Sequence, residues 1–218
     1  HGEYKKAFAD RAVVYRAYYP VGIEETTGEP IRLPYWLMSG DEFRLLVIGK
    51  TEKEATSQNN IIYKALTHAR MVQADLIEPA PSDYGFELPT DIAASDLPRA
   101  KTGVTPERIQ SFDRDKPRPF SLVELTNHIK FSQGVNVTGG KTKSKSNSDL
   151  SDEGFRSILD KISVLRSDPR IRFLIEEIAD DAPTLASVIG QFVGESGDGT
   201  GLADIRIIDI SGLPNEVS

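Results

Sequence analysis

The clearest hydrophobic pattern lies near the end of the sequence, at residues 205–210. Four isoleucines fall within this stretch, which stops at Ser211-Gly212. Such a density of β-branched residues is typical of a strand buried on both faces in a parallel sheet. Ligands of open α/β sheets bind at the carboxyl ends of the strands, so Asp209 and Ser211 are candidate site residues. An alternative stays open, in which Asp209 only caps a turn.

A second strand is predicted over residues 12–19, and apolar residues between the two strands recur at three- and four-residue steps. This spacing predicts four or five amphipathic helices. Three of them open on a capping-box pattern, which starts at Ser39, at Thr51 and at Ser121. A short further helix is expected after Thr105. The main helices are expected over residues 40–48, 51–76, 121–130, 155–167 and 185–192.

Other stretches lack such a pattern. Residues 132–152 consist almost wholly of small polar and charged residues, which predicts a mobile segment. Four prolines within residues 78–101 predict a long loop. An extended connection is expected over residues 21–34. Residues 171–175 are compatible with a short strand or with an apolar docking segment.

Composition narrows the possible functions. The 218 residues contain no cysteine and three histidines, which excludes a disulfide framework and argues against a zinc site. His68 is interpreted as a packed or surface residue. No apolar run is long enough to span a membrane, so a cytoplasmic location is expected. The net charge of -7 indicates that the chain is not by itself the main contact for nucleic acid.

Two segments imitate a phosphate-binding loop. Gly49-Lys50-Thr51 lacks the earlier glycine of the GxxxxGK(S/T) pattern, because Arg44 stands at that position. Residues 134–142 miss the pattern by one inserted glycine. A phosphate loop follows a buried strand and opens a helix, whereas this segment follows a predicted helix. We therefore interpret residues 134–142 as a flexible loop.

Three separated motifs occur together in this chain: HGEY at residues 1–4, LPYWLMSGDE at residues 33–42 and IIDISGLP at residues 207–214. In this order they resemble the HerA/FtsK-like P-loop ATPases, and the resemblance spans the whole chain. Ile210 replaces a leucine of the family motif. Because the motifs stand at both ends, the chain is expected to be an interior segment of a longer protein.

The resemblance implies an α/β fold, in which a partial RecA-like parallel sheet carries a largely helical insertion. Residues 1–40 and 170–218 would form the sheet, and residues 41–169 the insertion with its flexible loop near 132–152. The nucleotide site would be lined on one side by His1, Gly2, Glu3, Asp209 and Ser211. No catalytic or metal-binding residue is assigned within the chain.

The parent that the resemblance implies is an ATP- and Mg-dependent DNA translocase or helicase, assembled as a homo-oligomer, expected to be a hexamer. A nuclease or another effector is a possible partner, and no membrane is expected. The chain contains no Walker A lysine, Walker B acid pair or arginine finger, so alone it is expected to be inactive and to bind no cofactor. The alternative is a non-catalytic acidic helical module that binds a neighbouring subunit or a partner protein.

Overall fold

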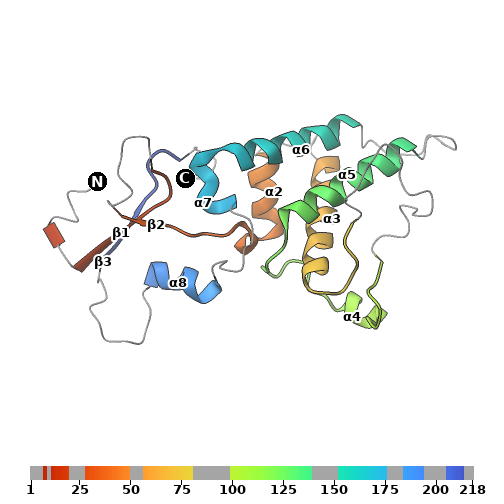
Figure 1. The fold of residues 1–218 in the computed structure, drawn as a ribbon, viewed down its shortest axis with the longest axis horizontal. Helices are drawn as coiled ribbons and strands as arrows, with labels where there is room; N and C mark the ends of the chain where they lie inside the picture. Colours follow the sequence, from red (N-terminus) through yellow and green to blue (C-terminus); the bar gives the residue numbers. More distant parts are fainter. Residues whose placement is uncertain are drawn as a thin grey trace. The chain divides into compact units, whose positions relative to one another are not determined.

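The computed structural model describes residues 7–8, 11–19, 28–49, 56–80, 99–138, 152–175, 184–193 and 205–213. The chain divides into two compact units, one formed by residues 1–37 and 164–218 and the other by residues 38–163 (Figure 1). The first unit contains β1 (Ala12–Arg16), β2 (Glu29–Pro30), η3 (Tyr35–Leu37), η6 (Pro169–Ile171), α7 (Arg172–Ile175), α8 (Leu185–Val193) and β3 (Ile205–Asp209). The second contains α2 (Gly40–Ile48), α3 (Thr56–Gln73), α4 (Pro106–Gln110), α5 (Leu122–Thr138) and most of α6 (Asp152–Ser167).

The sheet in the described part of the chain has three parallel strands in the order β2-β1-β3. β1 pairs with β3 from Ala12 opposite Ile205 to Arg16 opposite Asp209. On its other side β1 pairs with the two-residue strand β2. The predicted α/β class, with a parallel sheet and a large helical part, is confirmed.

β3 is not the buried strand that its isoleucines predict. It lies at the edge of the described sheet, and 42% of Ile208 is exposed, as is 51% of Ile210. Ala12 and Val14 of β1 are 6% and 4% exposed. β1 is the central strand of the described sheet, since it pairs with β2 on one side and with β3 on the other.

The helical unit begins as the capping-box pattern predicts. The backbone N–H of Glu42 donates to Ser39 Oγ at 3.2 Å, and the N–H of Ser39 donates to Glu42 Oε2 at 2.8 Å. These hydrogen bonds from Ser39 lower the pKa of the Glu42 carboxyl. The helix ends at Gly49, whose φ of 85° is readily available to glycine and whose N–H donates to the carbonyl of Leu45 at 2.9 Å.

The core of this unit is built by α3 and α5, with α2 and α6 completing it. The predicted apolar stripe of α3 is buried and includes Ile62, Ala65 and Ala69. α5 buries Leu122, Leu125 and Ile129, and α6 buries Phe155, Ile158 and Ile162. The rings of Phe43 and Phe120 meet edge to face at 5.6 Å. Lys161 Nζ donates to the carbonyl of Ile48 at 3.2 Å, which connects α6 to the end of α2.

Two expectations about local structure need correction. α5 continues to Thr138 beyond its predicted end near residue 130, so the first part of the predicted mobile segment is helical; residues 139–151 lie outside the described ranges. Residues 171–175 complete a 3-10 turn and form the short helix α7, not a strand. Within the predicted extended connection over residues 21–34, residues 29–30 form the short strand β2, and residues 21–27 lie outside the described ranges.

Candidate functional site

The carboxyl ends of the three strands meet at one edge of the sheet. Arg16 ends β1 opposite Asp209, which ends β3. Two backbone hydrogen bonds extend the sheet by one residue there: Ile31 N–H donates to the Arg16 carbonyl at 2.9 Å, and Ala17 N–H donates to the Asp209 carbonyl at 3.3 Å. We call Arg16, Asp209 and the Ser211-Gly212 turn the sheet rim.

Asp209 connects the other polar groups of the sheet rim. Its Oδ1 accepts hydrogen bonds from Ser211 N–H at 3.0 Å and Ser211 Oγ at 2.6 Å, and its Oδ2 lies 3.6 Å from Arg16 Nε. The side chain is 8% exposed. Burial favours the neutral form, but the hydrogen bonds from Ser211 and the charge of Arg16 outweigh it and lower the pKa of Asp209. The geometry thus supports the turn-capping interpretation, with an ionised carboxylate that holds the turn.

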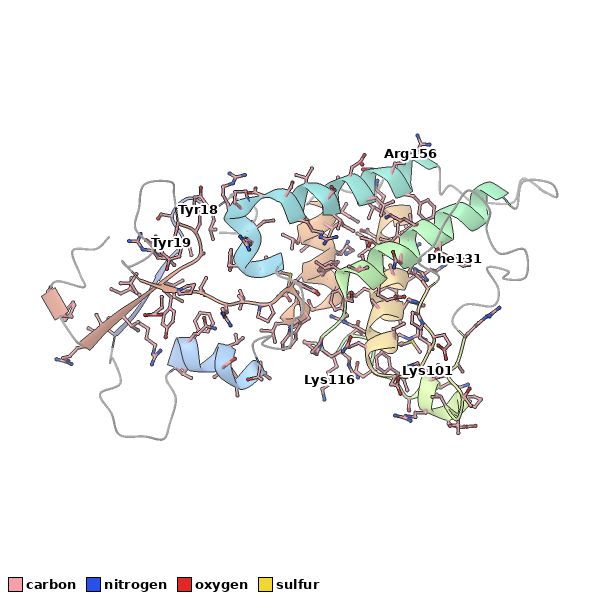
Figure 2. All side chains as sticks on the ribbon, in the orientation of Figure 1. Tyr18, Tyr19, Lys101, Lys116, Phe131 and Arg156 are labelled. Carbon is pink, nitrogen blue, oxygen red and sulfur yellow. The ribbon has the colours of Figure 1, made fainter. Side chains whose placement is uncertain are left out.

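Gly212 shapes the rest of the rim. Its φ is 83°, and a Cβ added there would lie 3.0 Å from Cδ1 of Tyr18. The next residue along the chain, Tyr19, donates its hydroxyl to the carbonyl of Gly28 at 2.9 Å. Figure 2 labels Tyr18 and Tyr19 beyond the end of β1. The ring of Tyr18 therefore lies directly against the Ser211-Gly212 turn that Asp209 holds.

A second polar cluster lies inside the helical unit and connects α3, α5 and the chain after α3. Glu124 Oε1 accepts from His68 Nε2 at 2.8 Å and from Ala80 N–H at 2.6 Å. The predicted capping box at Ser121 is therefore half formed: Glu124 N–H donates to Ser121 Oγ at 3.3 Å, but the Glu124 carboxylate binds elsewhere. The interpretation of His68 as a packed residue is confirmed, since it is 4% exposed.

The ring of His128 lies 4.4 Å from that of His68, centroid to centroid. Burial, and then the neighbouring His68, lower the pKa of His128 to about 3, so it is neutral at physiological pH. Among the described residues, no group of three or more histidine, aspartate or glutamate side chains could hold a metal ion. We interpret the cluster as structural.

Arg70 of α3 is a fully buried cation whose hydrogen-bond partners are backbone carbonyls. Nη1 donates to the carbonyl of Arg114 at 2.7 Å and Nη2 to that of Met38 at 2.9 Å, while the guanidinium lies 5.7 Å from the ring centroid of Phe120. Burial lowers the pKa of Arg70, and the nearby Asp115 opposes this effect. The side chain thus fixes the loop around residue 114 to the start of α2.

Comparison with known families decides the identity of this fold. The model of the family described as "Helicase HerA, central domain" matches residues 1–218. The chain belongs to this family. A comparison with curated proteins finds no match. The HerA assignment agrees with the parallel sheet, and it places the chain among the P-loop ATPases.

The predicted site residues of this HerA-family chain fall into two groups. Asp209 and Ser211 are brought together at the sheet rim. His1, Gly2 and Glu3 lie outside the described residues. The sequence pattern did not identify Arg16, whose signal is only that of a basic residue at the end of an apolar strand. Its partner is 193 positions away along the sequence, so only the strand register reveals the pair.

The HerA-family chain has no phosphate loop in the part that the structure describes. Gly49 ends α2, so Gly49-Lys50-Thr51 follows a helix and not a strand. Of the second imitation, residues 134–138 belong to α5 and residues 139–142 lie outside the described ranges. None of the helices in the described ranges is both long and apolar enough to cross a membrane.

Proposed function

We propose that this chain forms one wall of the ATP site of a DNA translocase or helicase of the HerA family. The family match over residues 1–218 carries the proposal. The sheet rim supports it, because ligands of open α/β sheets bind outside the carboxyl ends of the strands. ATP and Mg²⁺ would be held mainly by a phosphate loop contributed by residues outside this chain, since the 218 residues contain no GxxxxGK(S/T) sequence.

Asp209 has an indirect role in this proposal, and Ser211 belongs to the turn that Asp209 holds. Both Asp209 oxygens face groups of the chain itself, so Asp209 is a positioning residue that fixes the Ser211-Gly212 turn against the nucleotide. His1, Gly2 and Glu3 would stand at the tip of a neighbouring strand. Segments 1–40 and 170–218 would belong to the ATPase sheet, and segment 41–169 would be its insertion.

The whole protein would act in the cytoplasm as a homo-oligomer, in hexameric form, and move DNA with energy from ATP. A nuclease or another effector would be its partner. Taken alone, the 218-residue chain would hydrolyse no ATP, because phosphoryl transfer depends on charge neutralisation and positioning by a phosphate loop and a bound magnesium ion.

The test is ATP turnover by the longer protein that carries this chain, with Asp209 changed to Ala. A misplaced turn should lower kcat about ten- to a hundredfold in a variant that still folds. Asp168→Ala is the matched control, because Asp168 also caps a turn in the same unit, where it accepts from Arg170 N–H at 2.9 Å. Unchanged turnover in Asp209→Ala, or an equal loss in Asp168→Ala, would contradict the assigned role.

A further inference from the structure

One segment of the helical unit has a net charge opposite in sign to that of the whole chain. Residues 99–118 contain six basic and three acidic residues, a net charge of +3. The whole chain carries -7, so the other 198 residues carry -10. The segment comprises the loop before α4, α4 itself and the loop that follows it.

The three carboxylates of this segment are engaged within the fold. Asp113 Oδ1 accepts from the backbone N–H groups of Asp115 at 3.1 Å and Lys116 at 3.2 Å. Asp115 acts on the buried Arg70, whose pKa it raises. Glu107 is exposed, and its own backbone N–H and Thr105 lower its pKa. Their negative charges are already included in the net charge of +3.

The basic side chains point outward. Arg99, Arg108, Arg114 and Lys116 are exposed, and no carboxylate of the described residues forms an ion pair with them. Lys101 pairs with the exposed Asp75. Figure 2 labels Lys101 and Lys116 along the edge of the helical unit next to α4, and Arg156 on α6 at the opposite edge. We call these five cations, Arg99, Lys101, Arg108, Arg114 and Lys116, the basic loop surface.

The apolar residues of the same segment point inward. Val104, Ile109 and Phe112 pack against the buried cluster of Met71, Leu76 and Ile77. Phe112 also lies under the guanidinium of Arg118, 4.4 Å from its ring centroid. The basic loop surface thus presents no large exposed apolar side chain, whereas protein interfaces depend on buried apolar and aromatic anchors.

We propose that the basic loop surface contacts the phosphate backbone of DNA. Exposed cations without an apolar centre suit a phosphate backbone, and three of the five are arginines, whose planar guanidinium matches phosphate oxygens in a bidentate manner. The inference rests on the proposed function as a DNA translocase. It adds a contact site on the helical insertion, although the chain as a whole is acidic.

The experiment measures binding of the 218-residue chain to a fluorescent DNA duplex of about 20 base pairs by anisotropy, at several salt concentrations upward from about 50 mM. The test variant is Arg114→Glu/Lys116→Glu. The backbone carbonyl of Arg114, which Arg70 needs, is retained. The matched control is Lys130→Glu/Arg156→Glu, which makes the same charge change at exposed positions of α5 and α6 in the same unit. Circular dichroism verifies that both fold.

We expect the test variant to lose at least about tenfold in affinity and to show a salt slope shallower by about 2, since each phosphate contact contributes about 0.9. The control should stay within about threefold of the parent chain. Equal loss in both variants, or no duplex binding at about 50 mM salt, would overturn the proposal. Polyglutamate that competes for the chain as well as unlabelled duplex does would assign the surface to an acidic protein instead.

The assay needs no nucleotide, so its failure is separate from a failure of the proposed ATP site. If the chain binds duplex but the test variant binds equally well, DNA translocation stands and this surface is wrong. If Asp209→Ala leaves turnover unchanged while the test variant loses duplex binding, the sheet-rim assignment is wrong and this surface stands.

Discussion

Asp209 shows how one carboxylate can serve both the fold and a site. It holds the Ser211-Gly212 turn through two hydrogen bonds and faces Arg16 across the strand ends. From sequence, the choice between a turn cap and a site residue stayed open. The geometry supports the cap, and the proposed site role follows from what the cap positions. A residue that acts in this way is recognised only when its partners are known.

Replacing Asp209 with Asn should destabilise the chain in a pH-dependent manner. Asn keeps an oxygen for Ser211 but loses the charge that faces Arg16. Because the folded-state pKa of Asp209 is lowered, its charge-dependent stabilisation is present above the unfolded-state pKa near 4 and is lost as the pH falls through the folded-state value.

Urea unfolding of the parent chain and Asp209→Asn at pH 7 and at about pH 3 measures this effect. The difference in the free energy of unfolding should be larger at pH 7 and shrink at the lower pH. A difference that is the same at both pH values would show that the charge of Asp209 does not contribute.

Of the three predicted capping boxes, the one at Thr51 lies outside the described residues, and the other two show how far local sequence predicts side-chain bonding. The box of Ser39 and Glu42 forms completely, because neither residue has a competing partner among the described groups. The same pattern at Ser121 forms by half, since His68, 56 positions earlier, and Ala80 take the Glu124 carboxylate. The sequence pattern contains no information on these distant partners. The burial of Arg70 was not predicted for the same reason, because its partners, the carbonyls of Met38 and Arg114, are also distant in the sequence.

At the level of elements, helix periodicity predicted more than strand composition did. The apolar stripes of α3 and α6 identified their buried faces, because burial of one helix face requires that spacing. Isoleucine content suggested that β3 is the buried strand, yet β1 occupies the centre. Strand order depends on pairing between distant segments, which residue composition does not specify. α5 extends beyond its apolar stripe because adding residues to a packed helix is easier than starting one.

The central place of β1 predicts a contrast between two substitutions. Val14→Asp would bury an unpaired charge in a side chain position that is 4% exposed, which should cost several kcal/mol, roughly 3 or more, and prevent stable folding. Ile208→Asp places the same charge at a position that is 42% exposed and should cost about 2 kcal/mol or less.

Urea unfolding followed by circular dichroism compares the two variants with the parent chain. A cooperative transition is expected for Ile208→Asp and none for Val14→Asp. If Ile208→Asp were the more damaging substitution, β3 would be the buried strand that its isoleucines suggest, and the strand order β2-β1-β3 would be wrong.

For the whole molecule, three dispersed motifs predicted the family, and the family match over residues 1–218 confirms it. Net charge was a poorer guide. A value of -7 argues against a large nucleic-acid contact, but an average over the chain hides the positive segment at residues 99–118. The three-part division at residues 1–40, 41–169 and 170–218 stays a prediction about how the parent ATPase is built.

The central claim is that this chain forms one wall of an ATP site but does not itself bind the phosphates. Calorimetric titration with Mg-ATP tests it most directly, on the 218-residue chain and on the longer protein that we propose carries it. The chain alone should give no measurable heat of binding, whereas the longer protein should bind, because the phosphate loop supplies most of the contacts. Tight binding by the chain alone would contradict the account, and its loss in Lys141→Ala but not in Lys50→Ala would identify Gly139-Gly140-Lys141-Thr142 as a true phosphate loop.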